Sequence, residues 1–247
     1  NHLREKCPRM RGIRWILCVG EESDQECLPN TATHVGSLRH DVKRFGTIDY
    51  INVPAFEEGF ACLEAYQYSF DLQCAPTQLK RAADLFARFP NIPVCINHMG
   101  KLRQLDAKSM DYQTEDIRSK KGRMLQDWKD GMQALSKLPH VFCKLSMLGY
   151  AVPGWHKDPQ QGALLKQLLK WVVMDWFGPK RCMSALNWHT SAAISDTDGL
   201  DEEGPSPIEY IQTLSALLPE ELTLEQRNDI FAQNACRFYQ MQTGVSI

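Results

Sequence analysis

The sequence predicts an α/β fold built on a parallel sheet, and it favours a closed barrel over an open doubly wound sheet. Strand-like stretches alternate with helix-like stretches along the chain, and such alternation implies parallel strands joined by right-handed crossovers. No glycine-rich phosphate loop follows any predicted strand, which weakens the nucleotide-binding open sheet. Polar residues occupy several positions that are expected to face inward, which favours the barrel.

Five stretches have the composition or the alternation that is typical of strands. They cover residues 12–19, 69–74, 93–98, 141–147 and 181–189. In the second stretch, Ser69, Asp71 and Gln73 are expected to share one face, because successive side chains of a strand point to opposite sides. A barrel of eight strands would therefore need weak strands that escape recognition, or segments before residue 1.

Helical periodicity separates the strands. The predicted helices cover residues 54–66, 78–89, 123–138, 162–177, 208–218 and 224–239. Pro54 suits a first helical turn, and Thr77 is expected to cap the second helix. The acidic stretch 196–207 is expected to be a solvated loop. No interdomain linker is apparent, so residues 1–247 are expected to form a single domain.

Composition excludes several classes of function. The formal net charge of -2 gives no general attraction to nucleic acid, and no apolar stretch is long enough for a membrane helix. No signal peptide opens the chain, so a cytoplasmic protein is expected. The expected partner is a small-molecule substrate rather than a nucleic acid or a membrane, and self-association into a homo-oligomer stays open.

The nine cysteines are expected to be reduced thiols. Their number is odd, and no pair has the Cys-x-x-Cys spacing that would suggest a zinc cluster or a redox pair. Four of them lie in apolar strand-like stretches, namely Cys18, Cys95, Cys143 and Cys182. Cysteines in such positions are typically buried, so neither a disulfide scaffold nor a zinc site is predicted.

His98 is the residue from which a function can be argued. It ends the apolar stretch 93–98, and parallel α/β barrels hold their chemistry at the carboxyl ends of their strands. A single histidine at such a position can equally be a satisfied core residue. Position alone leaves both interpretations open.

Four segments together resemble a known family. They are Ile96–Lys101 (INHMGK), Cys143–Ser146 (CKLS), Phe177–Met183 (FGPKRCM) followed by Asn187 and Trp188, and Asn234–Tyr239 (NACRFY). In this order they resemble amidohydrolase-related proteins, most of all the branch of 2-pyrone-4,6-dicarboxylate lactonase and the sugar lactonases. The resemblance implies an α/β fold of the (β/α)8 TIM-barrel type and a hydrolase that opens a small lactone or similar ester with activated water. A decarboxylase of the same wider family and a non-catalytic ligand-binding barrel are the alternatives.

Two departures from the family bear on the chemistry. Members carry a His-x-His pair at the end of the first barrel strand, and none of the seven histidines here forms one. The chain is therefore expected to lack its first one or two βα units, which leaves its activity open. Asn187 stands where relatives have an acid, and a carboxamide cannot act as a base near pH 7. An intact relative could hold a divalent metal, but weak or no metal binding is expected here.

The catalytic candidates are His98, Asn187 and His189. The resemblance implies that His98 acts as a general base or as an electrophile at the scissile carbonyl. Asn187 could orient water or donate a hydrogen bond to an oxyanion. His189 lies two residues further, so on a regular strand it would point the same way and could replace the missing acid. An ordinary loop histidine is the alternative for His189.

Lys144 lies in the middle of an apolar strand, where a lysine needs a partner. Asp71 lies two strands earlier, and alternate strands of a barrel contribute to the same interior layer. We therefore expect an ion pair between them, and we weigh this structural role against binding of a substrate carboxylate.

The remaining substrate-binding candidates come from strand ends and loops. Gln73 could hydrogen-bond a substrate, and Lys101 could attract an anionic one. The loop 149–156 is expected to lie over the barrel mouth, where Tyr150, Trp155 and His156 could line a pocket. A packed loop with an aromatic anchor is the alternative.

Overall fold

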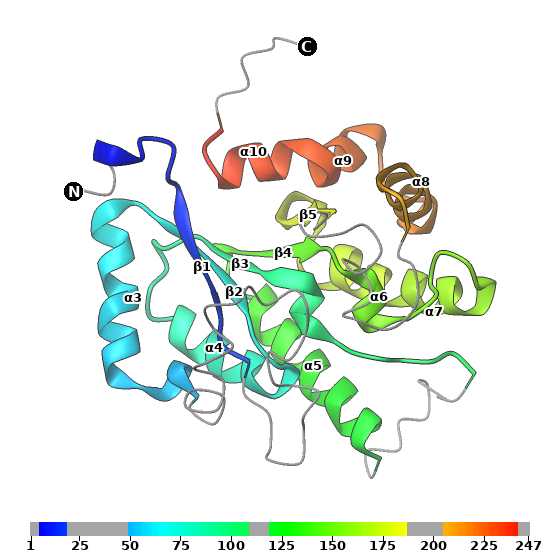
Figure 1. Ribbon diagram of the computed structural model, residues 1–247, viewed down its shortest axis with the longest axis horizontal. Coiled ribbons are helices and arrows are strands. Elements are labelled where there is room, and N and C mark those ends of the chain that lie inside the picture. Colours follow the sequence, from blue (N-terminus) through cyan, green and yellow to red (C-terminus); the bar gives the residue numbers. More distant parts are fainter. Residues whose placement is uncertain (1–4, 19–48, 109–118, 187–204, 242–247) are drawn as a thin grey trace.

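The computed structural model describes residues 5–18, 49–108, 119–186 and 205–241 (Figure 1). Its five described strands form one sheet in the order β1-β2-β3-β4-β5, and every neighbouring pair is parallel. They are β1 (Gly12–Ile16), β2 (Ser69–Gln73), β3 (Val94–Ile96), β4 (Val141–Leu145) and β5 (Cys182–Ser184). Because each strand pairs with the next along the chain, the predicted parallel α/β architecture is confirmed, with five of the eight strands of a full barrel described.

Helices connect the strands and flank the sheet (Figure 1). The α-helices are α3 (Pro54–Tyr66), α4 (Leu79–Phe86), α5 (Lys120–Ser136), α6 (Leu148–Ala151), α7 (Pro159–Lys170), α8 (Pro207–Leu217), α9 (Leu224–Asn228) and α10 (Asn234–Phe238). The shorter 3-10 turns are η1 (Tyr50–Asn52), η2 (Pro76–Gln78), η3 (Asn97–Lys101) and η5 (Pro179–Arg181), and π turns follow α7 and α9 as η4 (Trp171–Trp176) and η6 (Asp229–Gln233). Each predicted helix is present with boundaries shifted by a few residues.

Local hydrogen bonds explain where several helices begin. The hydroxyl of Ser119 accepts from the backbone N–H of Gly122 at the start of α5. Ser206 and Thr223 form capping boxes at the starts of α8 and α9. Each hydroxyl accepts from the backbone N–H of the third helical residue, whose side chain accepts from the backbone N–H of the cap residue. Such caps satisfy backbone donors that have no partner within the helix.

Two local predictions were wrong. Thr77 does not cap α4, because it lies inside the preceding turn η2 and no side chain caps the helix. The Gln78 side chain instead accepts from the backbone N–H of Ala75 and donates to the carbonyl of Leu17. The strand predicted to end at His98 ends at Ile96, and His98 lies in the turn η3.

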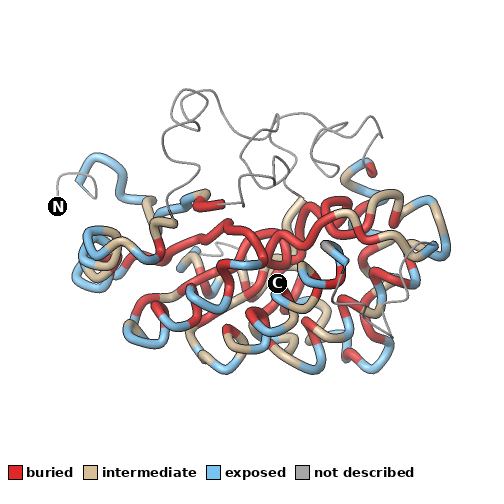
Figure 2. Tube along the Cα trace, turned by 90° about the horizontal axis from the view of Figure 1, so that it is seen from below, coloured by how far each residue is buried: buried red, intermediate tan, exposed pale blue. Residues whose placement is uncertain are grey.

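The sheet separates an apolar layer from a polar one. Phe70, Leu72 and Cys74 belong to the main core, where they pack among buried residues of the helices. Figure 2 shows these buried stretches running through the middle of the molecule, with exposed stretches outside. On the other face, Cys95 packs with Met183 and with Phe238 of α10. The alternation predicted for residues 69–74 therefore directs Asp71 and Gln73 to the second face.

The described cysteines are free, as predicted, and Cys18, Cys95, Cys143 and Cys182 are buried. In the part of the chain that the structure describes, no helix combines the length and the apolar character that crossing a bilayer requires. The expectation of a single domain over residues 1–247, and that of missing first βα units, stay predictions.

Candidate functional site

Polar side chains gather at the edge of the sheet where the strands end. Gln73 is the last residue of β2, His98 follows β3 by two residues, and Ser146 follows β4 directly. Because all the strands are parallel, these three positions lie along the same edge. All three residues are buried, so their polar atoms need partners inside the protein.

His98 makes a contact through each of its ring nitrogens. Its Nδ1 lies 2.8 Å from the hydroxyl oxygen of Ser146, and its Nε2 lies 3.1 Å from Nη2 of Arg14 on β1. The same Nη2 donates to Oε1 of Gln73 at 2.9 Å. The ring also meets that of Tyr150 edge-on, with centroids 5.8 Å apart. His98 is thus held by Arg14 of β1, by Ser146 directly after β4 and by Tyr150 of α6.

These contacts select one form of the imidazole. A guanidinium can only donate hydrogen bonds, so Nε2 of His98 must accept from Arg14. The ring proton then resides on Nδ1 and is donated to Ser146. His98 is therefore neutral in this arrangement, because an imidazolium would place an N–H against the guanidinium.

We predict that nitrogen-15 NMR of the protein shows His98 as the Nδ1–H tautomer near neutral pH. In the variant Arg14→Met, which removes the donor to Nε2, the share of the Nε2–H tautomer should rise. His140 serves as the internal control, because it directly precedes β4 at the opposite end of the strands and its signals should stay unchanged. A dominant Nε2–H tautomer in the unmodified protein would contradict the geometry.

The turn η3 has an unusual backbone. His98, Met99, Gly100 and Lys101 have φ values of 54°, 49°, 72° and 55°, in the left-handed region. For residues other than glycine such a conformation costs about 1 to 3 kcal/mol at each position. A bond of 2.5 Å from Nε1 of the buried Trp128 to the carbonyl of Met99 helps to hold the turn. This turn brings both His98 and Lys101 to the polar edge of the sheet.

Gly100 is required in this turn for a second reason besides its positive φ. A Cβ atom at this position would lie 2.9 Å from Sδ of Met132 and 3.0 Å from a methyl group of Leu79. The glycine that the sequence places after His98 and Met99 thus lets α4 and α5 pack directly against the site's backbone.

The predicted ion pair between Lys144 and Asp71 is confirmed. Nζ of Lys144 lies 2.6 Å from Oδ1 of Asp71 and donates to Oδ1 of Asn97 at 3.0 Å. The hydroxyl of Tyr239, next to α10, donates to both carboxylate oxygens of Asp71, at 2.8 and 2.9 Å. Burial, with Cys95 and Asp71 nearby, raises the pKa of Tyr239 well above its ordinary value, so it stays a donor. Whether Lys144 also binds substrate stays a prediction.

Lys101 has surroundings of a different kind. Its side chain is buried, and within the described part of the chain its Nζ contacts Sγ of Cys18 at 3.6 Å and faces the ring of Tyr150 at 5.7 Å. No carboxylate within the described ranges forms an ion pair with it. Arg103 faces the same ring, also at 5.7 Å. Tyr150 thus lies between two cations and His98.

Of the three aromatic candidates in the loop 149–156, Tyr150 contacts this group directly, through the rings and cations described above. Trp155 is buried against Tyr210 of α8, with ring centroids 5.6 Å apart, and Tyr210 donates to the carbonyl of Leu145. His156 meets the ring of Trp155 rather than that of Tyr150. Trp155 therefore has the surroundings of a packing anchor, and substrate-binding roles for Trp155 and His156 stay predictions.

Two residues of this group were not singled out from the sequence. Arg14 is the polar residue in the middle of an apolar strand, and its register opposite Asp71 places it on the polar face. Ser146 ends the Cys143–Ser146 segment that carried the family resemblance. The sequence did offer a signal for Arg14, because a charged residue in the middle of an apolar strand is expected to face a polar site or solvent. Asn187 and His189 lie outside the described residues.

The described residues do not form a metal centre. No group of three or more His, Cys, Asp or Glu side chains is placed to hold a metal within the ranges described. His98, the residue expected to survive from such a centre, directs Nε2 toward a guanidinium, and a second cation at that nitrogen would be repelled.

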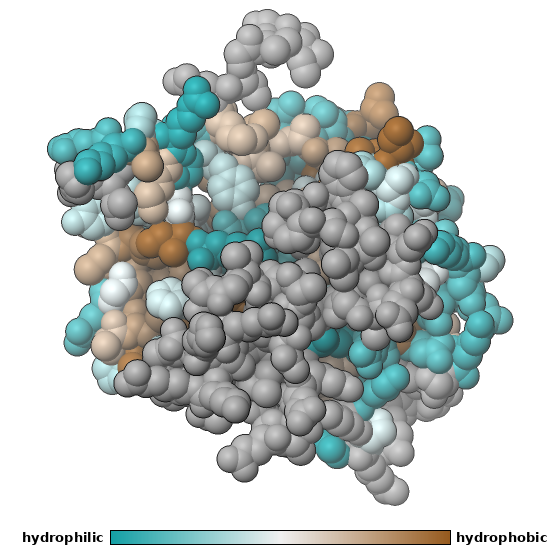
Figure 3. All heavy atoms as spheres, in the orientation of Figure 1, coloured by the Kyte–Doolittle hydropathy of each residue, from teal (hydrophilic) through white to brown (hydrophobic). Residues whose placement is uncertain are grey.

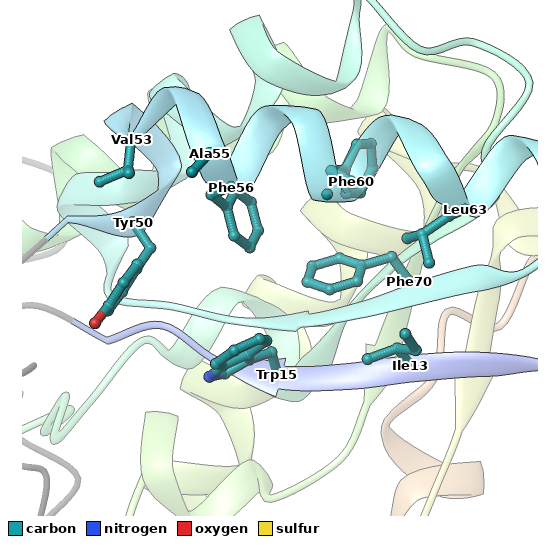
Figure 4. A pocket seen from close by; sticks show the side chains of 10 residues that line it. Ile13, Trp15, Tyr50, Val53, Ala55, Phe56, Phe60, Leu63 and Phe70 are labelled. Atoms are coloured by element: carbon teal, nitrogen blue, oxygen red, sulfur yellow. The ribbon is translucent and has the colours of Figure 1, made fainter. Parts of the chain in front are cut away.

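An apolar pocket of about 370 Å³ lies on the opposite face of β1. Figure 4 shows Ile13 and Trp15 of β1 and Phe56 and Phe60 of α3 pointing toward it, together with Phe70. Apolar atoms also gather over β1 and α3 on the face drawn in Figure 3. Among the described residues that line this pocket, Tyr50 is the one with a titratable group, so they offer no acid or base suited to hydrolysis near neutral pH.

The fold and the polar edge define a parallel α/β protein with a neutral histidine and cations at the carboxyl ends of its strands. Residues 33–241 match the model of the Amidohydrolase family (Amidohydro_2), and the chain belongs to this family. The resemblance carried by its four segments is thereby confirmed.

Individual relatives are distant. The chain is 23% identical over 188 residues to the uncharacterized protein y4mH of Sinorhizobium fredii, covering 76% of this chain and 52% of that protein. It is 26% identical over 159 residues to L-fucono-1,5-lactonase of Burkholderia multivorans, covering 63% and 49%. The chain thus spans about half the length of these curated relatives.

Solved structures share the fold. An amidohydrolase from Burkholderia multivorans with bound zinc superposes with a TM-score of 0.63 at 22% identity, over 94% of this chain and 65% of that one. A putative 2-pyrone-4,6-dicarboxylic acid hydrolase from Pseudomonas putida gives 0.57 at 13% identity, over 93% and 63%. The predicted amidohydrolase-type α/β fold is confirmed.

Proposed function

We propose that this protein is a hydrolase that opens a small lactone by attack of water on the ring carbonyl. The observation that carries the proposal is His98, held neutral between Arg14 and Ser146 at the carboxyl edge of a sheet of the amidohydrolase family. The similarity to an L-fucono-1,5-lactonase supports a lactone as the kind of substrate.

The residues at the sheet edge can serve both halves of such a reaction. Attack of water on the carbonyl forms a tetrahedral oxyanion, which an N–H donor of Arg14 can stabilise. The attacking water loses a proton, and a neutral imidazole such as His98 can accept it once Nε2 is released from Arg14. Breakage of the ring C–O bond then gives a carboxylic acid and an alkoxide. The imidazolium of His98 returns its proton to the alkoxide, which becomes the alcohol, and the carboxylic acid releases one proton to the solvent.

Asn187 and His189 keep their proposed places in this scheme. Asn187 would orient the water or donate to the oxyanion, and His189 would be a second base. Gln73 contacts Arg14, and Tyr150 contacts His98. These contacts support both residues as substrate-binding candidates. The proposed reaction uses no metal, in keeping with the donor set around His98.

The proposal predicts that the full chain hydrolyses members of a panel of γ- and δ-lactones, with one proton released per ring opened. His98→Ala should lower kcat/KM by about 100-fold or more, because a positioned general base contributes about 10²–10⁴-fold. His140→Ala, which alters a histidine at the other end of the strands, should leave turnover unchanged if circular dichroism shows a folded protein.

Other outcomes would identify the alternatives. Release of carbon dioxide from a carboxylic acid substrate would identify a decarboxylase, since ring opening conserves carbon. Saturable binding of a lactone without turnover would identify a ligand-binding barrel. A metal-to-protein ratio near one after purification without chelator would overturn the proposal that no metal is held.

We also propose a cytoplasmic location and a small-molecule partner. The free, buried thiols support a reducing compartment. Self-association into a homo-oligomer is compatible with the exposed apolar side chains of β1, Ile13 and Trp15.

A further inference from the structure

The apolar pocket between β1 and α3 lies on the face of the sheet that is turned away from His98. We propose that this pocket is a second binding site, and that its ligand is a small, neutral aromatic molecule of one or two rings. Pockets that enclose small ligands measure about 300–1,000 Å³, and this one, at about 370 Å³, suits a ligand at the small end of that range. The inference does not depend on the lactone hydrolysis proposed above.

Strand β1 contributes to both sites through alternate side chains. Arg14 reaches His98 on the polar face, whereas its neighbours Ile13 and Trp15 line the pocket on the other face (Figure 4). Both neighbours are partly exposed, Ile13 by 37% and Trp15 by 46%. The rim of the pocket thus presents apolar surface to solvent, and a ligand that covers this surface is stabilised by its burial.

The walls of the pocket indicate the kind of ligand. Five of the ten lining residues are aromatic, and none carries a charge near neutral pH. The buried rings of Phe60 and Phe70 meet edge to face, with centroids 5.3 Å apart, and Phe56 meets Phe70 in the same way at 6.1 Å. Such an arrangement presents ring edges and ring faces, which a further aromatic ring contacts favourably. A charged ligand would lose its hydration here without gaining a charged partner from the lining residues.

Gly59 of α3 points to a ligand by an independent route. It lines the pocket, and a Cβ atom at this position would meet nothing within 4 Å beyond the backbone of its own helix. Its φ is not among the positive values, so neither packing nor backbone conformation requires glycine here. Glycine nevertheless makes a helix interior less stable than alanine does. The missing side chain leaves this wall of the pocket open, so that a flat ring can lie against the helix.

The test is titration calorimetry of the full chain with 2-naphthalenemethanol as the probe. Gly59→Leu, which fills the pocket, should weaken binding of this alcohol by at least about tenfold. Gly59→Ala should weaken binding less and should raise Tm by about 1 to 4 °C, because alanine favours the helix. Ala65→Leu, at an exposed position of the same helix that does not line the pocket, is the matched control and should leave binding unchanged. The charged counterpart, 2-naphthoate, should show no binding that Gly59→Leu removes.

Trp15→Ala is a second variant, which weakens binding by removing part of the rim and keeps the test available if Gly59→Leu does not fold. Circular dichroism checks the folding of each variant. Absence of binding up to about 1 mM probe, or binding that both Gly59→Leu and Trp15→Ala leave unchanged, would overturn the proposal. So would self-association in sedimentation that excludes the probe and that Trp15→Ala abolishes, because a second copy of the chain would then occupy the pocket. Lactone hydrolysis by Gly59→Leu should equal that of the unmodified chain, so this inference and the proposed function can fail separately.

Discussion

Replacing Lys101 with methionine is expected to stabilise the folded protein while it weakens binding of anionic ligands. Lys101 is buried without a carboxylate partner among the described residues, and methionine fills a similar volume without a charge. Removing the desolvation cost of the ammonium should raise the free energy of unfolding by about 1 to 3 kcal/mol. For a chain of this size that corresponds to an increase in Tm of about 2–4 °C for each kcal/mol.

Thermal and urea unfolding, with and without an added carboxylate ligand, measure this effect. The ligand should stabilise the unmodified protein by mass action and should stabilise Lys101→Met less. Lys80→Met is the control, because the side chain of Lys80 on α4 is exposed and the change should have little effect. A marked loss of stability in Lys101→Met would show that the lysine has a structural role. It would contradict the interpretation that the buried ammonium lowers stability and is kept for binding.

Breaking the ion pair between Asp71 and Lys144 is expected to have the largest destabilising effect. Asp71→Asn removes the negative charge beside the ammonium of Lys144, which is left with neutral amide oxygens as acceptors, and it weakens the two bonds from Tyr239. Removal of one partner of a buried pair costs about 3 to 5 kcal/mol, because the other charge is left buried. The loss should appear in urea unfolding as a lower midpoint.

A double-mutant cycle isolates the interaction. The variant Asp71→Asn/Lys144→Met should be less destabilised than the sum of the two single variants, because no charge is then left without a partner. The exposed pair Lys166–Glu220 is the control, and removing its charge should change stability little. Additive effects at positions 71 and 144 would contradict the pairing.

The pair shows what strand periodicity can predict. Alternation along residues 69–74 places Asp71 on the polar face, and a lysine within an apolar strand requires a partner on a strand nearby. Both rules depend only on the geometry of a parallel sheet. The contact of Tyr239 with Asp71 could not be predicted in this way. The two residues are 168 positions apart in the sequence, and they meet because α10 packs across the polar face of the sheet.

His98 shows where such prediction fails. The sequence placed it correctly at the carboxyl edge of the sheet, but as the last residue of a strand rather than in a left-handed turn. Residues other than glycine rarely adopt this conformation, so the backbone preferences of His98, Met99 and Lys101 argue against it. The hydrogen bond from Trp128 to the turn helps to hold it there in spite of those preferences. Arg14 was missed for a related reason, since its meeting with His98 requires the register of three strands.

The sequence alone determined the parallel α/β fold and the amidohydrolase family, because periodicity and segment order are properties of the chain itself. Only the tertiary structure decided which cations have counter-ions and which form of His98 is present. Those properties arise from distances between side chains far apart in sequence. Asp71 lies 2.6 Å from the ammonium of Lys144, whereas no carboxylate of the described residues forms an ion pair with Lys101.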